Sequence, residues 1–223
     1  MNMLRRFRCI IFDKDGTLFC SKNMTKVWSQ AITHGILSIP TVSIKKKNQA
    51  ILNINNYLPT HLEQETWAKI EEDIAKEIVL ASNESLDLAK SRIRSWTPPR
   101  SPQGIKPGVM EFLKIWPHKT ALLTSDDYKP TMLDLNRFNL DFDIIVTGDQ
   151  VTKGKPDPEG LNKILNELQV SPKETCIIGD SHADIALKKT GKLGGAFGVR
   201  TNHESIPGAC LMVDDISELL SQI

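Results

Sequence analysis

The chain has 223 residues, a formal net charge of +1 and 40% apolar residues. This length and composition are enough to bury one sizeable core, or a core together with a smaller domain. The balanced charge gives no reason to expect nucleic acid or an anionic membrane as the main partner. The sequence also lacks any apolar run near the roughly 18 residues that a membrane span needs.

The first residues and the cysteines indicate the compartment. The apolar run that follows the basic N-terminal residues ends at Phe12, which makes it too short for a signal peptide. The four cysteines show no CxxC spacing, so we interpret them as reduced thiols and not as a disulfide set or a zinc site. We therefore expect a cytoplasmic protein, either a monomer or a homodimer, that binds neither nucleic acid nor a membrane.

A short apolar run near the start ends in an unusual group of polar residues. Residues 8–12 are predicted to form a buried strand, and Asp13, Asp15 and Gly16 follow it directly. The glycine allows a sharp turn at the carboxyl end of the strand, which is where open α/β sheets bind ligands. Two carboxylates separated by one residue repel each other, so the pair favours a cation between them. The alternative is an ordinary strand followed by an Asp-Gly turn.

The residues after this strand carry helical patterns. Apolar residues at helical spacing predict a helix from Met24 to Ile32, with Gly35 as its stop. A second, weaker helix is predicted from Ser43 to Ile54. These apolar stripes indicate helices that pack on helices, and none resembles a cofactor site.

A longer helical stretch follows. Thr60 and Glu63 form a capping-box pattern that predicts its start, and Asn83 is expected to break it. The proline-rich residues 97–104 then predict a linker. An all-helical segment of about eighty residues thus separates the first strand from the rest of the chain.

After the linker the pattern alternates between strands and helices, which predicts a doubly wound parallel α/β sheet with helices on both faces. We therefore divide the chain into an α/β core, residues 1–19 and 104–223, and an inserted helical cap, residues 20–103. The predicted strands of this part are 120–123, 144–146, 175–178, 194–199 and 211–213, and the predicted helices are 109–116, 131–138, 161–168, 183–190 and 216–223.

Polar residues also follow the ends of later strands. Thr124 and Ser125 follow one predicted strand, and Asp180 follows another, with Asp184 four residues later. Lys155 precedes a predicted helix. Carboxylates suit Mg²⁺, a lysine neutralises phosphate charge, and hydroxyl and backbone N–H groups donate to phosphate oxygens. Each residue alone could be a helix cap or a loop charge, but their common place at strand ends favours a site for a phosphate beside a magnesium ion.

The order of these groups resembles the haloacid dehalogenase superfamily, and within it the phosphoglycolate phosphatase-like branch with a helical cap. The resemblance covers residues 8–18 and 105–213; the first and last motifs are specific, and the middle two are persuasive only beside them. Ser125 stands where relatives commonly have asparagine, and Gly160 where they usually have a larger residue. The matching motifs are Asp13-Lys14-Asp15-Gly16-Thr17-Leu18, Thr124-Ser125, Gly154-Lys155-Pro156-Asp157-Pro158-Glu159 and Gly179-Asp180-Ser181-His182-Ala183-Asp184-Ile185.

This resemblance implies a Mg²⁺-dependent phosphatase that hydrolyses a small phosphate ester through an aspartyl-phosphate. Asp13 would be the nucleophile, and Asp15 would protonate the leaving oxygen and then activate water. A carboxylate oxygen of Asp13, the backbone carbonyl of Asp15 and the side chain of Asp180 would hold Mg²⁺.

The resemblance also implies which residues bind the phosphate. Thr124 and the backbone of Ser125 would contact the phosphoryl oxygens. Lys155 would pair with both the phosphate and Asp13, and Asp184 would position Lys155 or a metal-bound water.

Three other functions are possible for this set of motifs. A dehalogenase has no need of the acid at Asp15, so its presence argues for phosphoryl transfer. A phosphomutase shares all four motifs and differs in needing a cap that excludes water. A non-catalytic binding protein of the same fold would usually have lost Asp13 or Asp15. The predicted cap does not identify the substrate. It has 11 basic and 8 acidic residues between Ser21 and Gln103, and its run Lys45-Lys46-Lys47 is best interpreted as a solvated helix face, the alternative being a contact for an anionic substrate.

Overall fold

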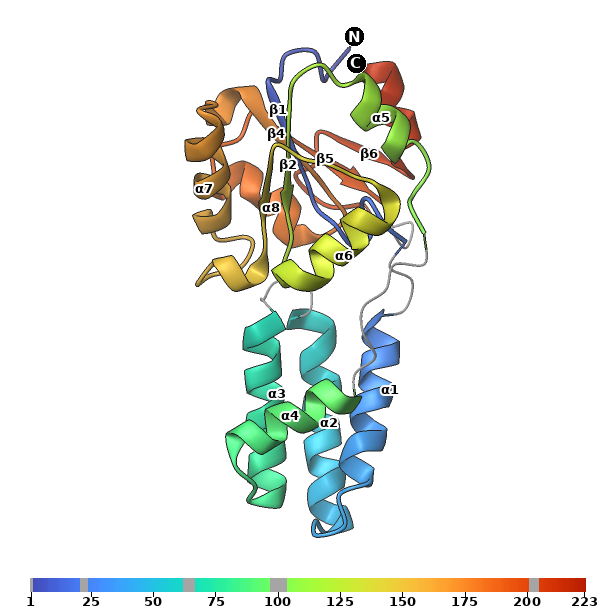
Figure 1. Cartoon of the computed structure of the whole chain (residues 1–223), viewed down its shortest axis with the longest axis vertical. Coiled ribbons are helices and arrows are strands. Elements are labelled where there is room, and N and C mark those ends of the chain that lie inside the picture. The colour runs from blue at the N-terminus through green and yellow to red at the C-terminus, as the bar shows by residue number, and fades with distance from the viewer. Residues whose placement is uncertain (1, 21–23, 62–66, 97–103, 201–204) are drawn as a thin grey trace. The chain divides into compact units, whose positions relative to one another are not determined.

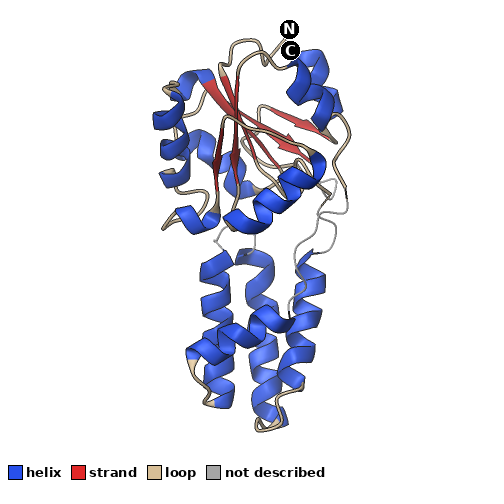
Figure 2. Ribbon diagram, in the orientation of Figure 1, coloured by secondary structure: helices blue, strands red, loops and turns tan. Residues whose placement is uncertain are grey.

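The computed structural model of the chain describes residues 2–20, 24–61, 67–96, 104–200 and 205–223 (Figure 1). The chain forms two compact units, one from Met1–Lys22 with Ser101–Ile223 and the other from Asn23–Arg100. The first unit contains a sheet and helices, and the second contains helices alone in its described part (Figure 2). The predicted linker lies outside the described residues apart from Gly104, and the covering role given to residues 20–103 stays a prediction.

In the described part of the first unit, six parallel strands form one sheet in the order β3-β2-β1-β4-β5-β6. Strand β1 is central, because Phe12 lies beside Leu122 of β2 on one side and Ile178 of β4 on the other. The predicted α/β class with a parallel sheet is therefore confirmed. The strands are β1 Cys9–Phe12, β2 Lys119–Leu123, β3 Ile144–Val146, β4 Thr175–Gly179, β5 Gly195–Val199 and β6 Leu211–Val213.

Helices cover both faces of this sheet (Figure 1). Ile10 and Phe12 pack with α5, α6 and a C-terminal 3-10 helix, whereas Cys9 and Ile11 pack with α7 and α8. Successive strand residues point to opposite faces, so a strand buried on both faces is apolar throughout. The helices are α5 Val109–Ile115, α6 Tyr128–Phe138, α7 Glu159–Leu168, α8 His182–Thr190 and the 3-10 helices Gly148–Gln150, Pro172–Glu174 and Ile216–Gln222.

The second unit is a group of helices with its own apolar core. Aliphatic side chains at helical spacing, among them Ile54, Ile74 and Ile93, are almost fully buried there. Among the helices of the described ranges, none is long and apolar enough to cross a membrane. The helices are α1 Met24–Leu37, α2 Ile44–His61, α3 Trp67–Ser82 and α4 Leu86–Trp96.

The predicted break at Asn83 is confirmed, but two predicted helix ends in this unit are wrong. Asn83 has a left-handed φ of 59° directly after α3. Thr60 lies at the end of α2 and does not start a helix, since α2 runs through Pro59 and the Thr60 hydroxyl donates to the carbonyl of Tyr57 (3.0 Å). Its expected capping partner, Glu63, lies outside the described residues.

Gly35 is a packing position inside α1 and not the end of that helix. A Cβ atom at residue 35 would lie 2.0 Å from Cδ2 of Trp96, so only glycine leaves room for the indole ring. The local sequence around Gly35 cannot distinguish a packing glycine from a helix stop, because the indole that it contacts belongs to a helix some sixty residues away in sequence.

Replacing Gly35 by valine is therefore expected to destabilise the helical unit by about 1–3 kcal/mol, the usual cost of overpacking. Circular dichroism during urea unfolding measures the loss. Gly104→Val is the matched control, because no atom of the described residues, its chain neighbours aside, lies within 4 Å of a Cβ there. Equal effects of the two substitutions would contradict the packing explanation.

Candidate active site

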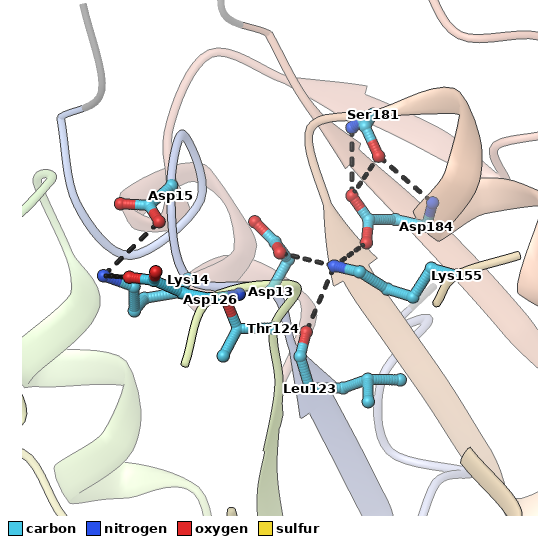
Figure 3. Close-up of polar contacts among 9 residues, drawn as sticks. All are labelled: Asp13, Lys14, Asp15, Leu123, Thr124, Asp126, Lys155, Ser181 and Asp184. Carbon is cyan, nitrogen blue, oxygen red and sulfur yellow. Dashed lines mark hydrogen bonds and ion pairs between the residues drawn. The ribbon is translucent and has the colours of Figure 1, made fainter. Parts of the chain in front are cut away.

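The carboxyl ends of β1, β2 and β4 meet at one edge of the sheet. The backbone N–H of Asp13 donates to the carbonyl of Ile178 (2.9 Å), which places the residue after β1 beside the end of β4. Asp13 and Thr124 thus lie at the same edge (Figure 3), and Asp180, 167 residues after Asp13, lies there too. This is the edge at which the sequence predicted a site.

The turn after Asp15 lies directly against Asp180. Gly16 has a φ of +88°, a left-handed conformation that favours glycine. A Cβ atom there would lie 1.8 Å from Oδ2 of Asp180, so glycine is also required by the close approach of this carboxylate. The glycine of the first motif therefore has a second role besides the turn.

Lys155 joins three parts of the site. Its Nζ lies 2.5 Å from Oδ1 of Asp13 and 2.6 Å from Oδ1 of Asp184, and it donates to the carbonyl of Leu123 (3.1 Å; Figure 3). The lysine is 6% exposed and Asp184 is 1% exposed, so water screens these ion pairs little. The lysine therefore connects the ends of β1 and β2 to the first turn of α8.

Asp184 is fixed by the start of α8. Its backbone N–H donates to the hydroxyl of Ser181 (3.2 Å), while its Oδ2 accepts from the Ser181 backbone N–H (3.1 Å) and hydroxyl (2.7 Å). This reciprocal capping uses one carboxylate oxygen and leaves Oδ1 for Lys155. Asp184 thus serves both as a helix-capping acid and as a ligand of the buried lysine.

The side chains of Asp13, Asp180 and Asp184 form a cluster that fits a divalent cation. One carboxylate oxygen from each lies within 4.8 Å of the others. Burial raises the pKa of Asp13 to about 7, with Lys155 opposing the rise and Asp184 adding to it. Burial, and then the charges of Asp13 and Asp184, raise the pKa of Asp180 well above its usual value. The three carboxylates offer hard oxygen ligands, which suit Mg²⁺.

A second buried lysine, Lys14, was not predicted to take part in the site. Its Nζ lies 2.7 Å from Asp134 Oδ2, 3.1 Å from Asp126 Oδ2 and 3.3 Å from Asp15 Oδ2. Burial alone would lower the pKa of Lys14, but these carboxylates outweigh it and raise the pKa. Sequence spacing gave no signal for this group, because Asp134 is 120 residues from Lys14.

The two predicted phosphate-binding residues lie just after β2. Thr124 is 5% exposed, and its hydroxyl accepts a hydrogen bond from the backbone N–H of Asp126 (3.1 Å), which leaves the hydroxyl proton available to donate. Ser125 follows and is partly buried. The roles assigned to both residues, and the metal contact of the Asp15 carbonyl, stay predictions.

Comparison with known proteins identifies the family to which the chain is similar. Residues 7–187 match the family described as haloacid dehalogenase-like hydrolase. The chain is 37% identical over 98 residues to a phosphorylated carbohydrates phosphatase from Thermotoga maritima, a match that covers 42% of this chain and 45% of that protein. It is 26% identical over 223 residues to the pyrophosphatase PpaX of Bacillus cereus, covering 96% of this chain and 95% of that one.

Solved structures give the same fold. A crystal structure from Thermotoga maritima, of a protein proposed to be a β-phosphoglucomutase, superposes with a TM-score of 0.67 and 24% identity. The superposition covers 96% of this chain and 97% of the other. Since the family match spans most of the sequence and includes all four motifs, the chain belongs to the haloacid dehalogenase-like hydrolase family and is an enzyme.

Proposed function

We propose that this protein is a Mg²⁺-dependent phosphate monoester hydrolase that acts on a small phosphorylated metabolite through an aspartyl-phosphate on Asp13. The main supporting observation is the buried ammonium of Lys155, which lies between Asp13 and Asp184 beside Asp180 at the sheet edge. The phosphatase and pyrophosphatase names of the two relatives support the same reaction class.

The first half of the reaction transfers the phosphoryl group to the enzyme. A carboxylate oxygen of Asp13 attacks phosphorus, the bond from phosphorus to the ester oxygen breaks, and Asp15 gives its proton to that oxygen. Lys155 holds Asp13 in place and offsets negative charge as it develops. Thr124 donates its hydroxyl proton to a phosphoryl oxygen, and the backbone N–H of Ser125 is proposed to do the same.

The second half regenerates Asp13. Asp15, now ionised, removes a proton from water, which attacks phosphorus and displaces the Asp13 carboxylate. Mg²⁺, held by Asp13, Asp180 and the carbonyl of Asp15, would stabilise the charge on the phosphoryl oxygens. Asp184 keeps Lys155 against Asp13 throughout both steps.

Metal removal and a substrate panel test this proposal. The chelator-treated chain is expected to release no phosphate from phosphoglycolate, nucleoside monophosphates or sugar phosphates, and to recover release when Mg²⁺ is added. Mg²⁺ alone should also raise the unfolding temperature, because it binds the folded cluster and not the unfolded chain.

Two results would count against the proposal. Phosphate release that continues unchanged in the presence of chelator would exclude the metal requirement. A sugar phosphate that is isomerised with little phosphate released would favour a phosphomutase, which can use the same Asp13, Asp15 and Lys155.

A further inference from the structure

We propose that Lys14 is a positioning residue that holds the carboxylate of Asp15 for proton transfer to the leaving oxygen. This inference rests on the proposed phosphatase function. Lys14 itself does not touch the reacting atoms in this assignment. It acts through Asp15, whose Oδ2 lies 3.3 Å from its ammonium (Figure 3).

Lys14 is well suited to this role because its ammonium is held in place. The side chain has no solvent exposure, and its Nζ also lies over the ring of Phe19 (5.8 Å to the centroid). Asp134 in α6 and Asp126 in the loop before α6 contact the ammonium from the core unit, at 2.7 and 3.1 Å. A buried side chain with this many contacts can determine the position of a more exposed one.

Asp15 is the most exposed of the three acids that contact Lys14. The side chains of Asp126 and Asp134 are 5% and 7% exposed, whereas that of Asp15 is 28% exposed. The two buried acids therefore anchor the ammonium, and the third carboxylate reaches toward solvent, where a substrate can approach. An acid that must give up and take back a proton needs such access.

The two acids of the first motif thus have separate lysines. Lys155 contacts Asp13 and Lys14 contacts Asp15, from opposite sides of the turn that follows β1 (Figure 3). A stability role alone explains Lys14 poorly, because well-packed apolar side chains often replace buried ion groups without loss of stability. The charge is better explained by what it does to Asp15.

Loss of Lys14 would remove the ammonium that contacts Asp15 Oδ2 and so would let this carboxylate shift from its position. A misplacement of about 1 Å can slow a reaction about 100-fold, and general acid catalysis contributes roughly 100- to 10,000-fold. The decrease in kcat/KM should be largest for esters whose leaving group must be protonated. A leaving group that is stable as an anion departs without a proton, so the hydrolysis of such esters depends little on Asp15.

The test compares two aryl phosphates that differ in this respect. Lys14→Met is expected to lower kcat/KM for phenyl phosphate at least about tenfold more than for 2,4-dinitrophenyl phosphate, at saturating Mg²⁺. Lys119→Met is the control, because Lys119 pairs with Asp143 (2.8 Å) at the opposite end of β2. The control should change neither rate appreciably.

A second variant controls for misfolding of Lys14→Met. Lys14→Met removes the ammonium that contacts Asp126 and Asp134, so the triple variant that adds Asp126→Asn and Asp134→Asn also removes the negative charge of both acids at nearly constant volume. It should show the same selective loss. An equal loss for both esters in the folded variants, or no loss, would overturn the role of Lys14. If the wild type released phosphate from neither aryl ester and from no ester of the metabolite panel, the proposed function would fail and this inference with it.

Discussion

Asp13→Asn is expected to leave a folded protein whose phosphatase turnover falls by at least about 1,000-fold, since an amide cannot attack phosphorus. The fold should persist because the change removes one of three crowded acids, and Lys155 keeps its contacts with Asp184 and the carbonyl of Leu123. Free phosphate from the best ester of the panel measures turnover, and circular dichroism measures folding.

A direct measurement of the covalent step accompanies this variant. In the wild type, acid quenching during turnover should leave a peptide that contains Asp13 heavier by one phosphoryl group. The same peptide should be unmodified in Asp13→Asn. Asp143→Asn is the matched control, since Asp143 pairs with a lysine at the far end of β2. Undiminished turnover in Asp13→Asn, or a phosphoryl group on another residue, would remove Asp13 as the nucleophile.

Lys155→Met is expected to lower both activity and stability. Without the ammonium, Asp13 and Asp184 are buried together with no internal cation, and breaking a buried pair usually costs about 3–5 kcal/mol. Turnover should fall by about 1,000-fold because Asp13 loses both its orientation and its charge partner. Urea unfolding and phosphate release measure the two losses.

Magnesium should offset part of the stability loss in this variant. A divalent cation at the three acids takes over some of the neutralisation that Lys155 supplied, so Mg²⁺ should stabilise Lys155→Met more than the wild type. Lys119→Met, whose ion pair is half-exposed, should cost less than about 1 kcal/mol and show no added response to Mg²⁺. A Lys155→Met chain as stable as the wild type would contradict the bridging role of this lysine.

The sequence predicted the parts of the site that follow from local pattern. Asp13, Thr124 and Asp180 each come directly after an apolar run, and parallel strands end at one edge, so their proximity followed from the βα pattern. Lys155 does not follow such a run, and its location in the site was predicted from the resemblance of its motif to that of the family. The structure puts its ammonium against Asp13, although its catalytic role stays a prediction.

What the sequence did not predict depends on contacts between distant residues. Asp126 and Asp134 gave no sign of meeting Lys14, because they lie 112 and 120 residues after it in the sequence. Gly160 stands where relatives usually have a larger residue, and a Cβ there would lie 2.7 Å from Cδ1 of Leu123, so glycine lets α7 approach β2. A sequence pattern indicates the local conformation that a residue prefers. It does not indicate which distant residues will contact it in the fold.

The central place of β1 has a consequence for how the chain folds. Its partners are β2, which begins at residue 119, and β4, which ends at residue 179, so both edges of Cys9–Phe12 stay open until most of the polypeptide has been made. Contacts between residues so far apart in sequence form slowly, and an apolar strand whose edges are unpaired promotes aggregation. Asp13 therefore reaches its working position late, and expression at low temperature or with chaperones should raise the yield of native protein.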